Sequence, residues 1–519
     1  MAQRPSGEVQ PALEDRGGAR LGGRLSRLGR VSTPRGLTPP ELRGTLSAIA
    51  VETPRRTKIV ATIGPASSSR ETLLALAEAG MNAARLNMSH GSHEEHAEIT
   101  KLVREVEAEI GRPIAVIADL QGPKVRLGDL PGPVTLERGD EVVVAPQDSA
   151  RGDELPVSPT AVCEVLQVGH EILIDDGLVR LRVESVDRGR VRCVVVAGGI
   201  VETHKGVNVP GVPVPIPSLT RKDMDDLDFA LDLGIDFIAL SFVRSAADVR
   251  DLRELITAAG AHAHVIAKIE KSEAVDALDA ILAEADAIMV ARGDLGVEIG
   301  AALVPLLQKR IILASLERAK PVITATQMLE SMIHQLEPTR AEASDVANAI
   351  LDGTSALMLS GETARGDYPV EAVAYMDRIA RAVEPSLGYR HQLPGASEEP
   401  TVGQAMSNAA CDLAESLGAE ALLVPTYTGG TASAVARLRP RRPIVGMSHH
   451  DYALRQMAIE WGVTPIFIPQ ATDVEDLWAR SLEGARASGL VTKGDLVVIT
   501  AGTAVNLPGT TNVIKVDLA

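Results

Sequence analysis

The chain is poor in aromatic side chains, which make up 2% of its 519 residues, and it contains only three cysteines. A large core must therefore be built from aliphatic side chains. Cys163, Cys193 and Cys411 show neither the spacing of metal ligands nor a disulfide framework. This cysteine usage argues against a disulfide-rich secreted domain and favours a reducing, cytoplasmic location.

The sequence also lacks long apolar runs and any excess of positive charge. No apolar run approaches the roughly twenty residues that cross a bilayer. The formal net charge is -17 at pH 7, and basic residues are dispersed through the chain after the first fifty residues. We therefore expect neither a nucleic-acid partner nor a membrane partner.

Residues 1–51 differ in composition from the rest of the chain. They are rich in glycine, proline, serine and arginine, and the first fifty residues contain no lysine. This composition predicts a disordered arm that cannot bury a core. An organellar transit peptide is the alternative, although Glu8, Glu14 and Asp15 do not fit the acid-poor composition of such peptides.

After the arm, apolar and β-branched runs alternate with segments of helical periodicity. The eight runs occupy residues 58–63, 82–87, 114–119, 237–241, 265–269, 287–290, 322–325 and 356–359. Strand and helix in regular alternation predict a (β/α)8 TIM barrel, an α/β fold, formed by residues 52–122 and 215–392. Polar residues at the C-terminal ends of these strands are then the candidates for an active site.

The third and fourth runs are separated by more than a hundred residues, which is too long for one crossover helix. Within this interval, residues 123–214 alternate at period two around Gly and Asp turns, which predicts an inserted small antiparallel β-barrel domain. Prolines crowd its exit at residues 210–217. We therefore expect a hinged lid over the barrel mouth.

Residues 400–519 return to alternating strand and helix patterns and predict a C-terminal α/β domain of ordinary size. Within it, residues 426–433 connect a strand to a helix. Hydroxyls and glycine amides at such a turn suit a phosphate, although they also serve as plain turn and cap residues. The candidate effector residues are Thr426, Thr428, Gly429, Gly430, Thr431 and Ser433.

Charged residues end two neighbouring apolar runs of the predicted barrel. Lys268 and Glu270 are two positions apart, so their side chains share one face of a strand, and Asp294 follows the next run after a glycine. Two carboxylates beside one ammonium suit a divalent metal that holds an anionic substrate. The alternative is an ordinary ion-pair cluster at the strand ends.

Several longer motifs resemble those of pyruvate kinase. They occupy residues 55–66, 80–91, 204–208, 266–270, 289–296, 325–332, 345–350 and 358–364. The resemblance extends from about residue 53 to the C-terminus. It implies the transfer of phosphate from phosphoenolpyruvate to ADP in glycolysis, and a homotetramer with a mobile lid and a regulatory C-terminal domain.

The resemblance also implies roles for the residues at the strand ends. Glu270 and Asp294 would hold Mg²⁺ or Mn²⁺, while Lys268 and Arg85 would contact the moving phosphoryl group. Gly293 and Asp294, with Thr326, would bind the substrate carboxylate. Thr326 would also lie near the proton path to the enolate, either as the donor or as the group that orients a water.

By the same resemblance, Arg126, Asp176 and Lys205 of the lid would face ADP or ATP when the lid closes. Arg126 and Lys205 could equally be solvated charges, and Asp176 belongs to a good turn sequence. His90 is a candidate ligand by type, but a hydrogen-bonded structural histidine is the expectation.

Many pyruvate kinases bind K⁺ in an oxygen cage, and the matching positions here are Asn87, Ser89, Asp119 and Leu120. The adjoining Gln121 and Lys124 stand where K⁺-dependent relatives have lysine and glutamate. Lys124 would supply a tethered positive charge as the cation substitute. The sequence therefore resembles the bacterial K⁺-independent type, for which K⁺ is not required.

The loop at residues 501–511 lacks the tryptophan and arginine pattern of relatives that respond to fructose 1,6-bisphosphate. A phosphorylated allosteric effector is still expected, and a sugar monophosphate or AMP is as plausible an effector as fructose 1,6-bisphosphate. Two alternative functions are another metal-dependent barrel enzyme acting on phosphoenolpyruvate or pyruvate (a lyase or aldolase), and a catalytically inactive metabolite-binding regulator.

Overall fold

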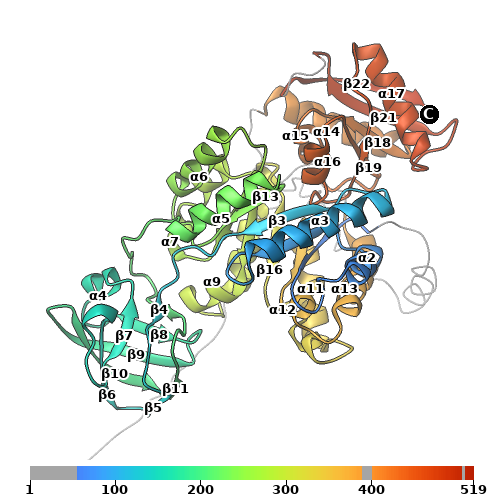
Figure 1. The fold of residues 1–519 in the computed structure, drawn as a ribbon. Helices are drawn as coiled ribbons and strands as arrows, with labels where there is room; N and C mark the ends of the chain where they lie inside the picture. Colours follow the sequence, from blue (N-terminus) through green and yellow to red (C-terminus); the bar gives the residue numbers. More distant parts are fainter. Residues whose placement is uncertain (1–54, 389–399, 505–508) are drawn as a thin grey trace, which may run out of the picture. The chain divides into compact units, whose positions relative to one another are not determined.

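Eight parallel strands close into a barrel, in the order β1-β17-β16-β15-β14-β13-β3-β2, and Figure 1 labels β3, β13 and β16 among them. Their bounds are β1 (Lys58–Thr62), β2 (Ala83–Asn87), β3 (Ala115–Asp119), β13 (Phe237–Leu240), β14 (His264–Ile269), β15 (Ala287–Ala291), β16 (Val322–Ala325) and β17 (Ala356–Leu359). All eight coincide with the predicted runs. Both faces of each strand are covered, which is why these segments are almost uniformly aliphatic. The predicted (β/α)8 barrel is confirmed.

The computed structural model describes residues 55–388, 400–504 and 509–519. The predicted arm at residues 1–51 lies outside them. No helix within these ranges is long and apolar enough to span a membrane.

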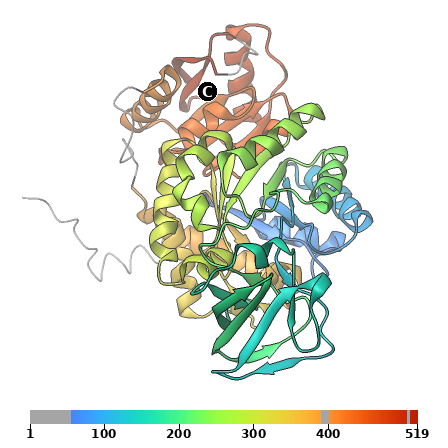
Figure 2. The ribbon, with the colours of Figure 1, turned by 90° about the vertical axis from the view of Figure 1, so that its left-hand side faces the viewer.

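Helices surround the barrel strands, and Figure 2 shows those coloured green to yellow outside the sheet. The helices of the barrel part are α2 (Arg70–Ala79), α3 (His93–Ile110), α5 (Arg221–Asp232), α6 (Ala246–Ala258), α7 (Ser272–Asp276), α8 (Leu278–Glu284), α9 (Arg292–Ile299), α10 (Val304–Glu317), α11 (Arg340–Asp352), α12 (Gly361–Ala364) and α13 (Pro369–Val383). Capping boxes at Ser92–Glu95 and Thr339–Glu342 fix the starts of α3 and α11.

The inserted segment forms a seven-stranded sheet in the order β12-β8-β9-β10-β6-β7-β4, with a separate β11-β5 pair. The elements are β4 (Arg126–Leu127), β5 (Val134–Leu136), β6 (Glu141–Pro146), β7 (Leu155–Ser158), α4 (Ala161–Val165), β8 (Glu171–Ile174), β9 (Val179–Asp187), β10 (Arg190–Ala197), β11 (Gly199–Val201) and β12 (Val207–Asn208). A bridge between Arg126 and Gly206 joins the two edges of the sheet.

The expectation of a purely antiparallel lid is wrong for one pair of strands. Strands β6 and β7 run parallel, because residues 147–154 carry the chain back before β7 starts. A 3-10 turn at Gln147–Ser149 begins this return. The alternation of residues indicated strands here but carried no information on their relative direction.

The C-terminal domain has a five-stranded sheet in the order β20-β19-β18-β21-β22. Its elements are α14 (Val402–Leu417), β18 (Ala421–Pro425), α15 (Gly430–Ala436), β19 (Ile444–Ser448), α16 (Asp451–Met457), β20 (Val463–Phe467), α17 (Val474–Ala487), β21 (Leu496–Gly502) and β22 (Thr511–Leu518). Strand β22 is antiparallel to β21 and was not predicted.

The C-terminal domain packs on the N-terminal end of the barrel. Ala458 and Ile459 belong to the same hydrophobic cluster as the barrel interior. Lys58 Nζ donates a 2.7 Å hydrogen bond to the carbonyl of Val463, and Arg455 pairs with Glu107 at 2.9 Å. The C-terminal ends of the strands lie at the opposite end of the barrel, where a site can form.

Candidate active site

A cavity of about 110 Å³ lies at the C-terminal ends of the barrel strands. Six of the eight strands, or the residues that directly follow them, contribute polar side chains to its wall. These side chains belong to Arg85, Asn87, Ser89, His90, Asp119, Gln121, Lys124, Ser241, Lys268, Glu270, Asp294 and Thr326. The sequence predicted a site at this end of the barrel. Of its candidates at the strand ends, Arg85, Lys268, Glu270, Asp294 and Thr326 meet here, whereas Gly293 does not line the cavity.

Lys268, near the end of β14, is the central cation of the cavity. Its Nζ lies 3.0 Å from Oε1 of Glu270, 3.2 Å from Oδ1 of Asp119 and 2.6 Å from the hydroxyl of Ser241. Burial alone would lower the pKa of this ammonium, but the carboxylates of Asp119 and Glu270 outweigh burial and raise the pKa above its ordinary value. The ammonium therefore stays charged at any physiological pH.

Arg85, from β2, brings a second cation to the same cavity. Its Nη2 lies 2.6 Å from Oδ2 of Asp119, and its Nη1 donates a 3.0 Å hydrogen bond to the hydroxyl of Thr62. Burial works to raise the pKa of Asp119, but Lys268 and Arg85 hold it below its usual range. Asp119 is thus an ionised anchor that orients both cations.

Glu270 follows β14 directly and is buried. Its Oε2 accepts a 2.7 Å hydrogen bond from the backbone amide of Phe242. Burial raises the pKa of Glu270, and the negative charge of Asp294 adds to the rise against the opposing effect of Lys268. Two carboxylates that repel each other in one cavity are a suitable pair of ligands for a divalent cation.

Thr326 follows β16, and its side chain contacts the backbone of Gly293. The amide of Gly293 donates a 2.8 Å hydrogen bond to Oγ1 of Thr326, and that hydroxyl donates to the carbonyl of Ala325 at 2.7 Å. Thr326 has a φ of 66°, which is a left-handed conformation that a β-branched residue rarely adopts. Strained backbone of this kind clusters at functional sites.

Lys124 of the inserted segment lines this cavity, and Asp176 of the lid lies in a neighbouring one. Both line a second cavity of about 100 Å³ that also includes Asp294, and Lys124 lines the first cavity as well. Partial desolvation raises the pKa of Asp176, and the charges of Asp294 and Asp175 add to the rise. Asp176 therefore lies within electrostatic reach of the barrel site.

Arg126 and Lys205, the other two lid candidates, do not line either cavity. Arg126 donates a 3.3 Å hydrogen bond to the carbonyl of His204, while Lys205 pairs with Asp175 at 3.0 Å. They lie side by side across the bridge that joins the two edges of the lid sheet. This arrangement leaves both cations on the lid, separate from the barrel cavity.

The four positions expected for an oxygen cage all line the barrel cavity: Asn87, Ser89, Asp119 and Leu120. Oδ1 of Asn87 accepts a 3.2 Å hydrogen bond from the amide of Ser89, and the carbonyl of Leu120 accepts one of 2.8 Å from Ser241. His90 also lines this cavity. The backbone carbonyl of His90 lies 2.9 Å from Nε2 of His96, and a structural role for the His90 ring stays a prediction.

A larger cavity of about 540 Å³ lies in the C-terminal domain. Of the six candidate effector residues, four line it: Thr426, Thr428, Gly430 and Thr431. Gly429 and Ser433 do not. The hydroxyl of Ser433 is turned to Oε1 of Glu460, 2.5 Å away.

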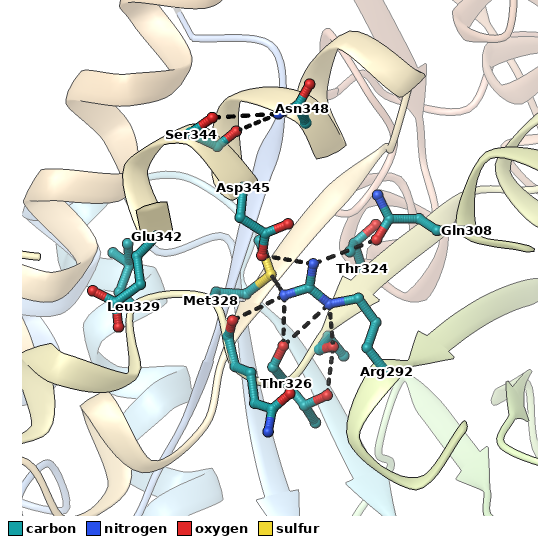
Figure 3. Close-up of polar contacts among 12 residues, drawn as sticks. Arg292, Gln308, Thr324, Thr326, Met328, Leu329, Glu342, Ser344, Asp345 and Asn348 are labelled. Carbon is teal, nitrogen blue, oxygen red and sulfur yellow. Dashed lines mark hydrogen bonds and ion pairs between the residues drawn. The ribbon is translucent and has the colours of Figure 1, made fainter. Parts of the chain in front are cut away.

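Some residues of these sites were not anticipated from the sequence. Arg292 immediately precedes the Gly293–Asp294 pair and binds the turn that carries Thr326 (Figure 3). Tyr427 and His449 add aromatic rings to the wall of the C-terminal cavity. A charged residue directly after the apolar run of β15 is the one signal that could have identified Arg292.

The closed barrel, its charged cavity at the strand ends and its inserted β domain define a (β/α)8-barrel enzyme for an anionic substrate. Two family models match the chain: "Pyruvate kinase, barrel domain" over residues 54–373 and "Pyruvate kinase, alpha/beta domain" over residues 404–517. The chain belongs to the pyruvate kinase family.

Individual relatives agree with this assignment. The pyruvate kinase of Geobacillus stearothermophilus is 46% identical over 471 residues, covering 89% of this chain and 80% of the relative. That of Mycobacterium intracellulare is 46% identical over 465 residues, covering 89% and 98%. The crystal structure of a pyruvate kinase from Cryptosporidium parvum superposes with a TM-score of 0.85 at 34% identity, covering 89% of this chain and 96% of that structure.

Proposed function

We propose that this chain transfers the phosphoryl group of phosphoenolpyruvate to ADP and forms pyruvate and ATP. The observation that carries the proposal is the charge arrangement in the barrel cavity. Lys268 and Arg85 converge there beside the carboxylates of Glu270 and Asp294. A trianionic substrate with a phosphate at one end and a carboxylate at the other requires this combination of fixed cations and metal ligands.

The chemistry balances without a covalent intermediate on the protein. An oxygen of the terminal phosphate of ADP attacks phosphorus, and the bond between phosphorus and the enol oxygen breaks. The electron pair of that bond stays on the enolate, which then takes a proton at its terminal carbon. Lys268 and Arg85 act by position and charge, because phosphoryl transfer needs little covalent help from the protein.

Glu270 and Asp294 fit a divalent metal, Mg²⁺ or Mn²⁺. The residues with described positions contain no group of three His, Cys, Asp or Glu side chains arranged to hold a metal. Two protein carboxylates would therefore leave the other positions to substrate oxygens and water, as Mg²⁺ prefers. When bound, the metal would neutralise phosphate charge and help to align the substrate.

Gly293, Asp294 and Thr326 are proposed to bind the substrate carboxylate. In this structure the amide of Gly293 is already bonded to the Thr326 hydroxyl. A bound carboxylate would take over that amide and free the hydroxyl toward the substrate. Thr326 would then lie on the path of the proton to the enolate, either as the donor or as the group that orients a water.

Nucleotide binding is proposed for the lid residues Arg126, Lys205 and Asp176. Arg126 and Lys205 supply positive charge for the phosphates of ADP. Both lie outside the cavities in this structure, so the proposal includes a movement of the lid that brings them to the nucleotide.

Independence from K⁺ is proposed because Lys124 lines the same cavity as the four oxygen-bearing cage residues. Its ammonium would supply the charge that a bound monovalent cation supplies elsewhere. At about 4 Å and an effective dielectric constant near 20, a unit charge is worth roughly 4 kcal/mol.

Control by a phosphorylated effector is proposed for the C-terminal cavity. Thr426, Thr428 and Thr431 place hydroxyls on its wall, and its volume of about 540 Å³ suits a phosphorylated metabolite. We further propose a homotetramer in the cytoplasm, in which effector binding lowers the KM for phosphoenolpyruvate.

A coupled assay tests the proposed activity against the alternatives. Pyruvate formation from phosphoenolpyruvate should require both ADP and Mg²⁺ and should yield one ATP per pyruvate. A lyase or aldolase would consume its substrate without ADP, and an inactive regulator would consume none. Either result would contradict the proposal.

A further inference from the structure

One guanidinium group binds three consecutive backbone carbonyls beside the active site. Arg292 donates from Nε to the carbonyl of Ala325 at 3.3 Å and from Nη2 to those of Thr326 and Gln327 at 2.7 and 3.0 Å. The side chain is 8% exposed. Figure 3 shows the guanidinium of Arg292 directed toward the turn that carries Thr326.

The carbonyls converge because the turn has an unusual backbone. Thr326 and Gln327 have φ angles of 66° and 53°, so two consecutive residues with side chains adopt the left-handed conformation. Each such residue is strained and persists only where its surroundings impose the conformation. A cationic donor that satisfies all three carbonyls is suited to impose it.

The residue after Arg292 holds the same turn from its other side. The amide of Gly293 donates to the Thr326 hydroxyl at 2.8 Å. Arg292 and Gly293 therefore fix the backbone and the side chain of Thr326 together. Asp294 follows Gly293 directly, so the position of the turn is fixed relative to a proposed metal ligand.

Two helices in turn hold Arg292. Its Nη1 lies 2.7 Å from Oδ2 of Asp345 on α11 and donates a 3.4 Å hydrogen bond to Gln308 on α10. Gln308 itself donates to Asp352 at 2.9 Å. The guanidinium is thus anchored by the outer helices and delivers its remaining donors to the active-site turn (Figure 3).

We propose that Arg292 is a positioning residue for proton transfer: it holds the hydroxyl of Thr326 where the enolate receives its proton. The role rests on the proposed function, because it concerns the second half of that reaction. Arg292 does not line the cavity, so it acts through Thr326 and not on the substrate. Its loss should impair proton transfer to carbon without removing the cations that face the phosphoryl group.

A double-mutant cycle tests this role, with the variants Arg292→Lys, Thr326→Ala and both together. The readout is solvent deuterium incorporation into the methyl group of pyruvate, followed by proton NMR with Mg²⁺ and ATP present. This exchange requires proton removal and return at carbon. ATP formation by the wild type from phosphoenolpyruvate and ADP is measured in parallel.

Lysine keeps the charge at position 292 but cannot reach three carbonyls at once. We expect Arg292→Lys alone to slow the exchange by about tenfold or more, as for loss of a group that acts on the transition state. In the Thr326→Ala background the same change should alter the exchange by less than about twofold. Arg104→Lys is the matched control, since Arg104 bonds to the carbonyl of Ile114 and to Asp236 at the opposite end of the barrel. It should leave the exchange unchanged in both backgrounds.

An undiminished effect of Arg292→Lys in the Thr326→Ala background would overturn the positioning role, as would normal exchange in the single variant. If Arg292→Lys does not fold, Asp345→Asn takes its place in the cycle, because it releases the guanidinium from α11. A folded wild type that forms no ATP overturns the proposed function instead. If the wild type is active and the effects of Arg292→Lys and Thr326→Ala on the exchange rate are additive, only the proposed role of Arg292 is overturned.

Discussion

The ammonium of Lys268 lies 3.0 Å from Oε1 of Glu270, two positions further along the same chain segment. Both side chains are almost completely buried. The carboxylate of Glu270, with that of Asp119, keeps the buried ammonium charged, while burial and Asp294 raise the pKa of Glu270 against the opposing effect of Lys268. The pair therefore ties the proposed phosphoryl contact to the proposed metal ligand.

Replacing Lys268 with methionine should lower kcat by orders of magnitude with little change in the KM for phosphoenolpyruvate. The ammonium faces charge that moves during the transfer, so its effect is largest in the transition state. Lys58→Met is a control, since Lys58 is a buried barrel lysine at the opposite end of the strands, bonded to Val463. A Lys268→Met enzyme that keeps a tenth of wild-type turnover would contradict the assignment.

Asp294→Asn should raise the Mg²⁺ concentration needed for half-maximal activity. An amide oxygen is a weaker ligand than a carboxylate, and we expect a shift of about tenfold or more. Titration of activity with Mg²⁺ measures the shift. The exposed Asp251 on α6, changed to Asn, should show none. Identical Mg²⁺ curves for Asp294→Asn and wild type would remove Asp294 from the metal site.

The wild type should be nearly fully active with tetramethylammonium as the sole monovalent cation. Lys124→Glu should create a K⁺ requirement, because it replaces a positive charge at the cavity with a negative one. Activity measured as a function of K⁺ concentration at constant ionic strength distinguishes the wild type from Lys124→Glu. Strong K⁺ activation of the wild type would disprove the role of Lys124 and leave the phosphoryl-transfer proposal intact.

Glu460→Gln should change how stability depends on pH. Burial raises the pKa of Glu460 to about 7, against the opposing effects of Ser433, Arg439, Lys58 and Lys320. The folded chain therefore holds a proton on Glu460 that the unfolded chain releases near pH 4.5. The contribution of this bound proton to the free energy of unfolding is present at low pH and is lost as pH rises toward 7. Glutamine mimics the protonated form of Glu460, so the variant should not lose stability as pH rises toward 7.

The free energies of unfolding of wild type and Glu460→Gln, measured by denaturant titration, should agree below pH 4.5, and the variant should be more stable near pH 8, by about 3 kcal/mol. Burial lowers the pKa of Lys58 to about 7, so its contribution has the opposite sign and strengthens above that pH. Glu415→Gln provides a control, since Glu415 bonds to the exposed amide of Arg441. Parallel pH profiles for wild type and Glu460→Gln would contradict a buried neutral Glu460.

The barrel could be predicted because each of its strands is a short aliphatic run bounded by polar residues. Parallel strands end at the same face, so Arg85, Lys268 and Asp294 were expected to meet without knowledge of the distances between them. The structure places them in one cavity. Their chemical roles stay predictions.

Other features left no signal in the sequence. Strand β22 has a mixed burial pattern at a sheet edge, and its alternation is too weak to distinguish it from a loop. The left-handed turn at Thr326 and Gln327 contains no glycine or asparagine, the residues that usually mark such a turn. The contact of Ser433 with Glu460 joins residues 27 positions apart and depends on packing that no local pattern specifies.

The most direct test of the proposed phosphoryl transfer is phosphorus NMR of the purified chain with phosphoenolpyruvate, ADP and Mg²⁺. The phosphoenolpyruvate resonance should disappear at the rate at which the γ-phosphate resonance of ATP appears, in equal amounts. Release of inorganic phosphate in place of ATP, or an unchanged phosphoenolpyruvate resonance, would contradict phosphoryl transfer to ADP at this site.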